Sequence, residues 1–137
     1  MSSVTNPRRP TGITALSYFF VFGTLMSGLA AMMLIFRGGV LEPLWRLNPC
    51  ARDSFIAMGS WALLLMAIVC FACAAAAVGL RRLTRWGFWT ALIILATNLV
   101  GDLTNAFIGG DWRTLIGLPI GGLMLAYLIR QRHAFLR

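Results

Sequence analysis

The chain is poor in charged side chains. Only 12% of its 137 residues are charged, and it contains four acidic residues, one histidine and no lysine. Soluble domains are nearer one quarter charged and one half apolar, whereas 59% of this sequence is hydrophobic and its mean hydropathy is +0.80. This number of polar side chains is too small to cover the surface of a soluble globular domain. The composition therefore excludes a soluble enzyme, a disordered tail and a disulfide-rich secreted module, and it indicates an integral membrane protein.

The shortage of histidine and cysteine limits the chemistry further. One histidine, His133, and three scattered cysteines cannot build a bis-His haem or a structural zinc site, so we expect no metal and no cofactor. The sequence also lacks a phosphate-binding Walker loop and a dinucleotide fingerprint. Cys70 and Cys73 form a C-x-x-C inside an apolar run, where buried apolar packing is the expected role rather than redox chemistry. We expect a protein without a catalytic site.

What the sequence has instead is a series of four apolar runs. A bilayer core needs roughly 20 helical residues, and hydrocarbon offers the backbone no hydrogen-bond partners, so these runs must be helices. The fourth run is at the short end of this range and contains Pro119. The predicted fold is all-α, a single four-helix transmembrane domain over residues 1–137. Its spans lie at about 13–36, 55–80, 86–108 and 114–129, with an outer loop at 37–54.

The arginines divide unevenly between the two sides of such a bundle. The side that holds both termini and the middle loop carries eight arginines, and the other side carries Arg37, Arg46, Arg52 and Arg113. Cytoplasmic loops carry the excess of basic residues, so both termini are predicted to be cytoplasmic. The arginines are confined to short segments between apolar runs, which is typical of this orientation signal. Because the signal accounts for the excess of basic residues, we expect no nucleic-acid partner. The use of arginine without any lysine favours a bacterial inner membrane as the location of the protein.

Small residues at four-residue spacing run along the predicted spans. Because lipid removes the usual hydrophobic drive between helices, association depends on close packing and on polar contacts. The stripes fit either packing inside one chain or the interface of a homo-oligomer, and both interpretations remain open. Their members are Gly23 with Ser27, Ala72 with Ala76, and Gly117 with Gly121.

One predicted span carries a polar cluster. Asn98, Asp102 and Asn105 fall at i, i+4 and i+7, which places them on one helix face. Asp102 is the one acid inside an apolar run, and a carboxylate at such a depth needs a partner, a water-filled cavity or a proton. The cluster is either a ligand, ion or proton site or a clamp that fixes the helix register. The candidate partners of Asp102 are Arg113, Arg37 and Arg52.

The fourth run is predicted to contain a kink or a locally unwound turn. Pro119 cannot donate a hydrogen bond to the carbonyl of Leu115, and Gly117 and Gly121 loosen the same stretch. Broken helices of this kind line the binding sites of some transporters. If the third and fourth spans form a hairpin, this break and Asp102 could meet.

The sequence supports two functional hypotheses. The first is a small non-enzymatic membrane protein that acts through helix–helix assembly, either as a homo-oligomer or as an accessory subunit of a membrane complex. The second is a small transporter or channel subunit that uses Asp102, Asn98, Asn105 and the break at Pro119. A membrane enzyme acting on lipid or quinone has the least support. The partners expected from the sequence are the lipid bilayer and other membrane subunits.

Overall fold

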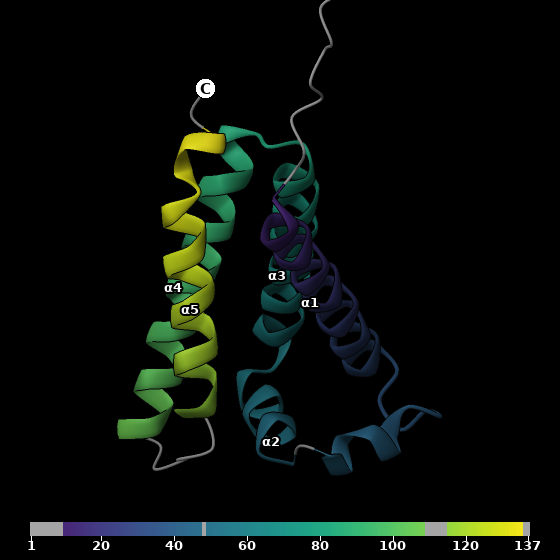
Figure 1. Cartoon of the computed structure of the whole chain (residues 1–137). Coiled ribbons are helices and arrows are strands. Elements are labelled where there is room, and N and C mark those ends of the chain that lie inside the picture. Colours follow the sequence, from purple (N-terminus) through teal and green to yellow (C-terminus); the bar gives the residue numbers. More distant parts are fainter. Residues whose placement is uncertain (1–9, 48, 109–114, 136–137) are drawn as a thin grey trace, which may run out of the picture. The chain divides into compact units, whose positions relative to one another are not determined.

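The computed structural model describes residues 10–47, 49–108 and 115–135, and within these ranges it contains helices and turns but no strand (Figure 1). Three helices are long and apolar enough to cross a membrane: α1 (Thr11–Ile35), α3 (Ser60–Arg81) and α4 (Arg85–Phe107). The shorter elements are α2 (Pro49–Met58), α5 (Gly117–Arg130) and the 3₁₀ helices η1 (Glu42–Leu47) and η3 (Arg132–Ala134). The prediction of an all-helical fold is confirmed for the described residues, and three of the helices are compatible with membrane spans.

Several hydroxyl side chains inside the apolar helices are satisfied locally. Thr24 donates to the carbonyl of Phe20 at 2.9 Å, and Thr104 donates to the carbonyl of Val100 at 2.7 Å. Such bonds, made one turn back along the same helix, let a polar side chain sit in an apolar helix without an external partner. The sequence can therefore carry threonine and serine in these helices without interrupting them.

The segment predicted as one helix over 55–80 is instead two helices. Gly59 separates α2 from α3 and has a φ of +59°, a left-handed conformation that glycine adopts without steric cost. Its amide donates to the carbonyls of Phe55 and Ile56, both at 3.2 Å, and so closes the last turn of α2. Because α2 begins at Pro49 and η1 precedes it, much of the predicted outer loop 37–54 is helical.

The chain divides into two units, which are described separately. The first contains the described residues of 10–19, 75–108 and 115–135, and the second contains those of 20–74. In the first unit α4 and α5 lie side by side as an antiparallel pair (Figure 1). The chain end folds back onto this pair, since Phe135 is 2% exposed and its ring centroid lies 5.4 Å from that of Phe88. These two rings fix the register of the carboxyl-terminal segment on α4.

A tight turn joins α3 to α4 within the first unit. Gly79 and Gly87 approach so closely that a Cβ on either residue would clash with the backbone of the other. Between them Leu83 adopts a φ of +53°, and Thr84 caps α4 by accepting a hydrogen bond from the Gly87 amide at 3.3 Å. This turn determines where α4 begins and therefore which of its residues face α5.

The second unit packs the later part of α1 against the earlier part of α3. A Cβ on Gly23 would lie 3.3 Å from the Cys73 sulfur, and the Cys70 thiol donates to the carbonyl of Thr24 at 3.5 Å. Cys70 and Cys73 are both free thiols. The predicted packing role of this C-x-x-C agrees with these contacts.

Candidate functional site

Asp102 lies in the contact between α4 and α5. Its side chain is half-buried, and a Cβ built on Gly117 would be only 2.5 Å from its Oδ2 atom. A side chain at position 117 would therefore displace the carboxylate. The sequence left open a meeting of Asp102 with the break at Pro119; in the structure the residue that lies against the carboxylate is Gly117, two positions before Pro119.

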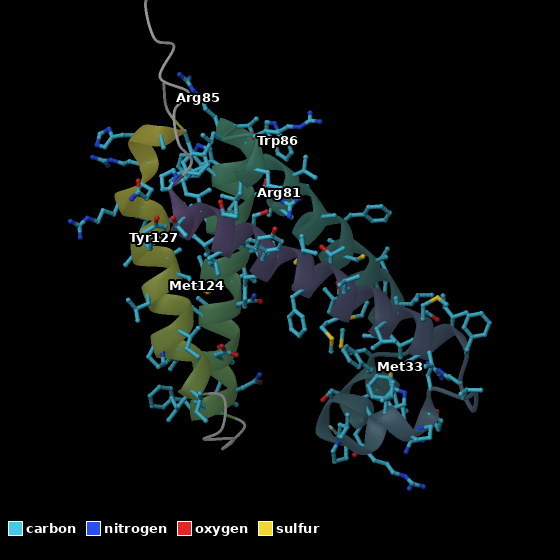
Figure 2. All side chains as sticks on the ribbon, turned by 45° about the vertical axis from the view of Figure 1, so that its right-hand side comes forward. Met33, Arg81, Arg85, Trp86, Met124 and Tyr127 are labelled. Atoms are coloured by element: carbon cyan, nitrogen blue, oxygen red, sulfur yellow. The ribbon has the colours of Figure 1, made fainter. Side chains whose placement is uncertain are left out.

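A pocket of about 350 Å³ opens beside this contact, inside the first unit. Asp102 and Asn98 are the polar side chains in its lining, which is otherwise apolar. Figure 2 labels Met124, which lines the pocket from α5, and Tyr127 one turn further along the same helix. The full lining is Phe19, Leu95, Asn98, Leu99, Asp102, Gly117, Ile120, Gly121 and Met124. A mostly apolar pocket with a few polar groups is the usual form of a small-molecule site.

The structure brings two of the three residues of the predicted polar cluster to this pocket. Asn98 and Asp102 line the pocket, whereas Asn105 is exposed and is not among the lining residues. Arg113, one of the three candidate partners of Asp102, lies outside the described residues. Among the described residues, no three histidine, cysteine or acidic side chains gather into a group that could hold a metal ion.

Pro119 occupies the third residue of α5, and residues 115–116 precede the helix in a 3₁₀ turn. Proline is tolerated in the first helical turn because amides there have no intrahelical acceptor. The expected break therefore lies at the beginning of the helix rather than within it. Pro119 is exposed and does not line the pocket.

Several of the predicted small-residue stripes are used for packing inside the chain. A Cβ on Gly121 would lie 2.5 Å from Leu99 Cδ1 on α4, and Ala76 is fully buried. Ser27 is buried and donates to the carbonyl of Gly23 at 2.7 Å, while Ala72 is half-buried. Two close approaches were not predicted from the sequence: Gly79 with Gly87, and Gly12 with the Tyr127 ring. The contact of Gly79 with Gly87 could have been predicted, because the two glycines flank the turn after α3.

A second polar cluster that the sequence did not predict joins α1 to the end of α3 in the first unit. Arg81 donates from Nε to the Ser17 hydroxyl at 3.1 Å, and Ser17 in turn donates to the carbonyl of Ala77 at 3.0 Å. The Arg81 guanidinium also lies 5.1 Å from the centre of the Tyr18 ring, within cation–π range. Arg81, Arg85 and Trp86, labelled in Figure 2, come from the adjoining ends of α3 and α4. The feature of the sequence that could have indicated this cluster was Ser17, a serine in an otherwise apolar run.

In the second unit, Glu42 ties η1 to its neighbours. Its Oε1 accepts from Arg52 of α2 at 2.6 Å, and its Oε2 accepts from the Gly38 amide at 3.3 Å. Two pockets adjoin this pair, of about 470 and 430 Å³; residues of the connecting segment and of α2 line both, and the end of α1 also lines the smaller one. Because this ion pair is substantially exposed, it contributes at most about 1 kcal/mol to stability.

Comparison with known proteins adds no relative: no family model, no curated protein and no solved structure matches the chain. Its function is therefore argued from its own residues and their arrangement.

Proposed function

We propose that the chain is a small integral membrane protein without a catalytic site, acting through helix–helix assembly as a homo-oligomer or as an accessory subunit of a membrane complex. The three long apolar helices are the span candidates, and α5 is proposed as the fourth span. With 14 residues α5 rises about 21 Å. This is shorter than the roughly 30 Å hydrocarbon core, so the fourth crossing requires residues before Gly117 or a locally thinner bilayer.

The proposed topology places both termini in the cytoplasm of a bacterial cell, with the protein in the inner membrane. In the first unit, five arginines lie in or directly after the end of α3, at the beginning of α4, and at the end of α5 and in η3. Trp86 and Trp89 lie in the first turns of α4. Arginine excess and interfacial tryptophan are features of the cytoplasmic ends of membrane helices. The five arginines are Arg81, Arg82, Arg85, Arg130 and Arg132.

The observation that carries the assembly proposal is how little of each long helix the chain covers. In the most apolar stretches of α1, α3 and α4, 17%, 28% and 22% of the residues are buried. Lipid can cover apolar side chains, but it cannot satisfy polar ones, and α4 also exposes asparagine and threonine. Helix packing against another subunit would cover both kinds of surface.

The test is the mass of the complex taken from the membrane with its surrounding lipid in a polymer nanodisc. We expect a particle that contains several copies of the chain, or one copy with a second protein in fixed ratio. Identification of every polypeptide in the particle distinguishes these two forms. A particle with one chain and lipid alone would contradict the proposal.

The Asp102 pocket favours a second candidate, a transporter or channel subunit. An intramembrane acid beside a pocket marks a substrate or ion pathway in many membrane proteins. The test is ion or substrate flux in proteoliposomes, comparing the wild type with Asp102→Asn, which keeps the side-chain shape and removes the charge. Flux lost in the variant would support transport, whereas equal flux in both and in protein-free vesicles would exclude it.

A further inference from the structure

One face of α4 is both polar and uncovered in the first unit. Five exposed residues lie within roughly 120° of the helix circumference, at 3.6 residues per turn. We call this set the α4 polar face: Thr97, Asn98, Gly101, Thr104 and Asn105. It adjoins the side of α4 that packs on α5, which carries the buried residues Phe88, Ala91, Leu95 and Ala106. Its edge reaches the pocket through Asn98.

The asparagines of this face differ from Thr104 in hydrogen bonding. Thr104 donates to its own helix, but neither the Asn98 nor the Asn105 carboxamide has a hydrogen-bond partner within the described part of the chain. Each carboxamide offers two donors and an acceptor oxygen. Left in hydrocarbon, these groups are costly, so membrane helices direct them towards other helices.

Gly101, at the centre of the face, has open space around it. No heavy atom lies within 4 Å of a Cβ built there, in contrast to Gly117 and Gly121, whose positions are closed by Asp102 and Leu99. The described residues therefore give no steric reason for glycine at position 101. A glycine flanked by asparagines one turn away on each side suits close approach of another helix backbone.

We propose that the occupant of the α4 polar face is α4 of a second copy of this chain. The inference rests on the assembly function proposed above and specifies its partner and its surface. All copies insert with one topology, so two α4 helices meeting in the membrane run parallel. About a two-fold axis, each residue then approaches its own counterpart. Carboxamides suit this arrangement because they are self-complementary, each donating to the oxygen of its counterpart, and Gly101 allows the two backbones to come close.

The experiment measures energy transfer between donor- and acceptor-labelled chains in lipid vesicles over a range of protein-to-lipid ratios. Because the sequence lacks lysine, an amine-reactive dye labels the terminal amino group alone. The variants are Gly101→Leu and Asn105→Leu. The matched control is Gly122→Leu on α5, where a Cβ also has nothing within 4 Å. We expect Gly101→Leu to raise the dissociation constant by about tenfold or more, Asn105→Leu to raise it several-fold, and the control to leave it unchanged.

The outcomes separate this inference from the proposed function. A wild-type chain that is monomeric at every ratio would overturn both self-assembly and the α4 interface. Wild-type transfer that neither α4 variant weakens would overturn the α4 interface and leave self-assembly standing, and so would equal weakening by the control. Circular dichroism of each variant establishes that it is folded. If Gly101→Leu does not fold, Asn105→Leu decides the outcome, because its side chain is exposed.

Discussion

Gly117 and Asp102 occupy complementary positions across the contact of α4 with α5. Oδ2 of the Asp102 carboxylate lies only 2.5 Å from the position that a Cβ on residue 117 would occupy. The absence of a side chain on one helix thus creates the space for the acid on the other. This relationship brings a polar residue into an apolar interface while keeping the two helices close.

Gly117→Ala should lower the stability of the α4–α5 pair. The added methyl group forces Asp102 out of its position, and we expect a loss of about 1–2 kcal/mol in the free energy of unfolding. Unfolding in mild detergent measures the effect, with Gly122→Ala as the control because its Cβ meets no neighbour. In an Asp102→Ala background the same substitution should cost little. An equal cost with and without Asp102 would show that the carboxylate is not the obstacle.

The Gly79 and Gly87 contact predicts a more severe effect, because here the obstacle is backbone. Gly79→Ala or Gly87→Ala should cost about 3 kcal/mol or prevent folding, since neither chain segment can yield without moving a helix. The matched control is Gly122→Ala, where the Cβ has room. Helical content and melting temperature in detergent provide the readout. Melting at the wild-type temperature for Gly79→Ala would contradict the close approach of α3 and α4.

Ser17→Ala should destabilise the first unit by about 1–2 kcal/mol, because Ser17 is fully buried and both accepts from Arg81 and donates to the Ala77 carbonyl. Thr90→Ala removes a comparable hydroxyl that bonds within its own helix to the Trp86 carbonyl. That control should change stability by a few tenths of a kcal/mol. Chemical denaturation of the two variants side by side makes the comparison. Equal losses would mean that the link between α1 and α3 adds nothing to stability.

Phe135→Ala should cost about 3 kcal/mol, since the buried ring packs on Phe88 and its loss leaves a cavity. Phe107→Ala is the control, because that ring is 76% exposed. Proteolysis of the carboxyl-terminal segment provides a local readout in addition to melting. We expect faster cleavage after Arg130 and Arg132 in Phe135→Ala alone. Unchanged cleavage would indicate that the end of the chain does not depend on this ring.

The sequence predicts the helical, membrane-compatible character of the chain because run length and apolarity alone determine it. It does not predict the interruption at Gly59, because a glycine inside an apolar run is also compatible with close helix packing, as Gly23 and Gly79 illustrate. Spacing placed Asn98, Asp102 and Asn105 on one side of α4. Only the position of α5 shows that Asp102 and Asn98 line a pocket while Asn105 does not. The register between two helices depends on contacts distant in sequence, which periodicity does not encode.

The proposal depends most on four crossings of the bilayer, and sidedness labelling tests this directly. Single cysteines are introduced as Thr11→Cys, Val40→Cys and His133→Cys, with the native cysteines replaced, and sealed vesicles are treated with a membrane-impermeant thiol reagent. We predict labelling of positions 11 and 133 from the cytoplasmic side and of position 40 from the opposite side. Labelling of positions 11 and 133 from opposite sides would contradict the four-span account.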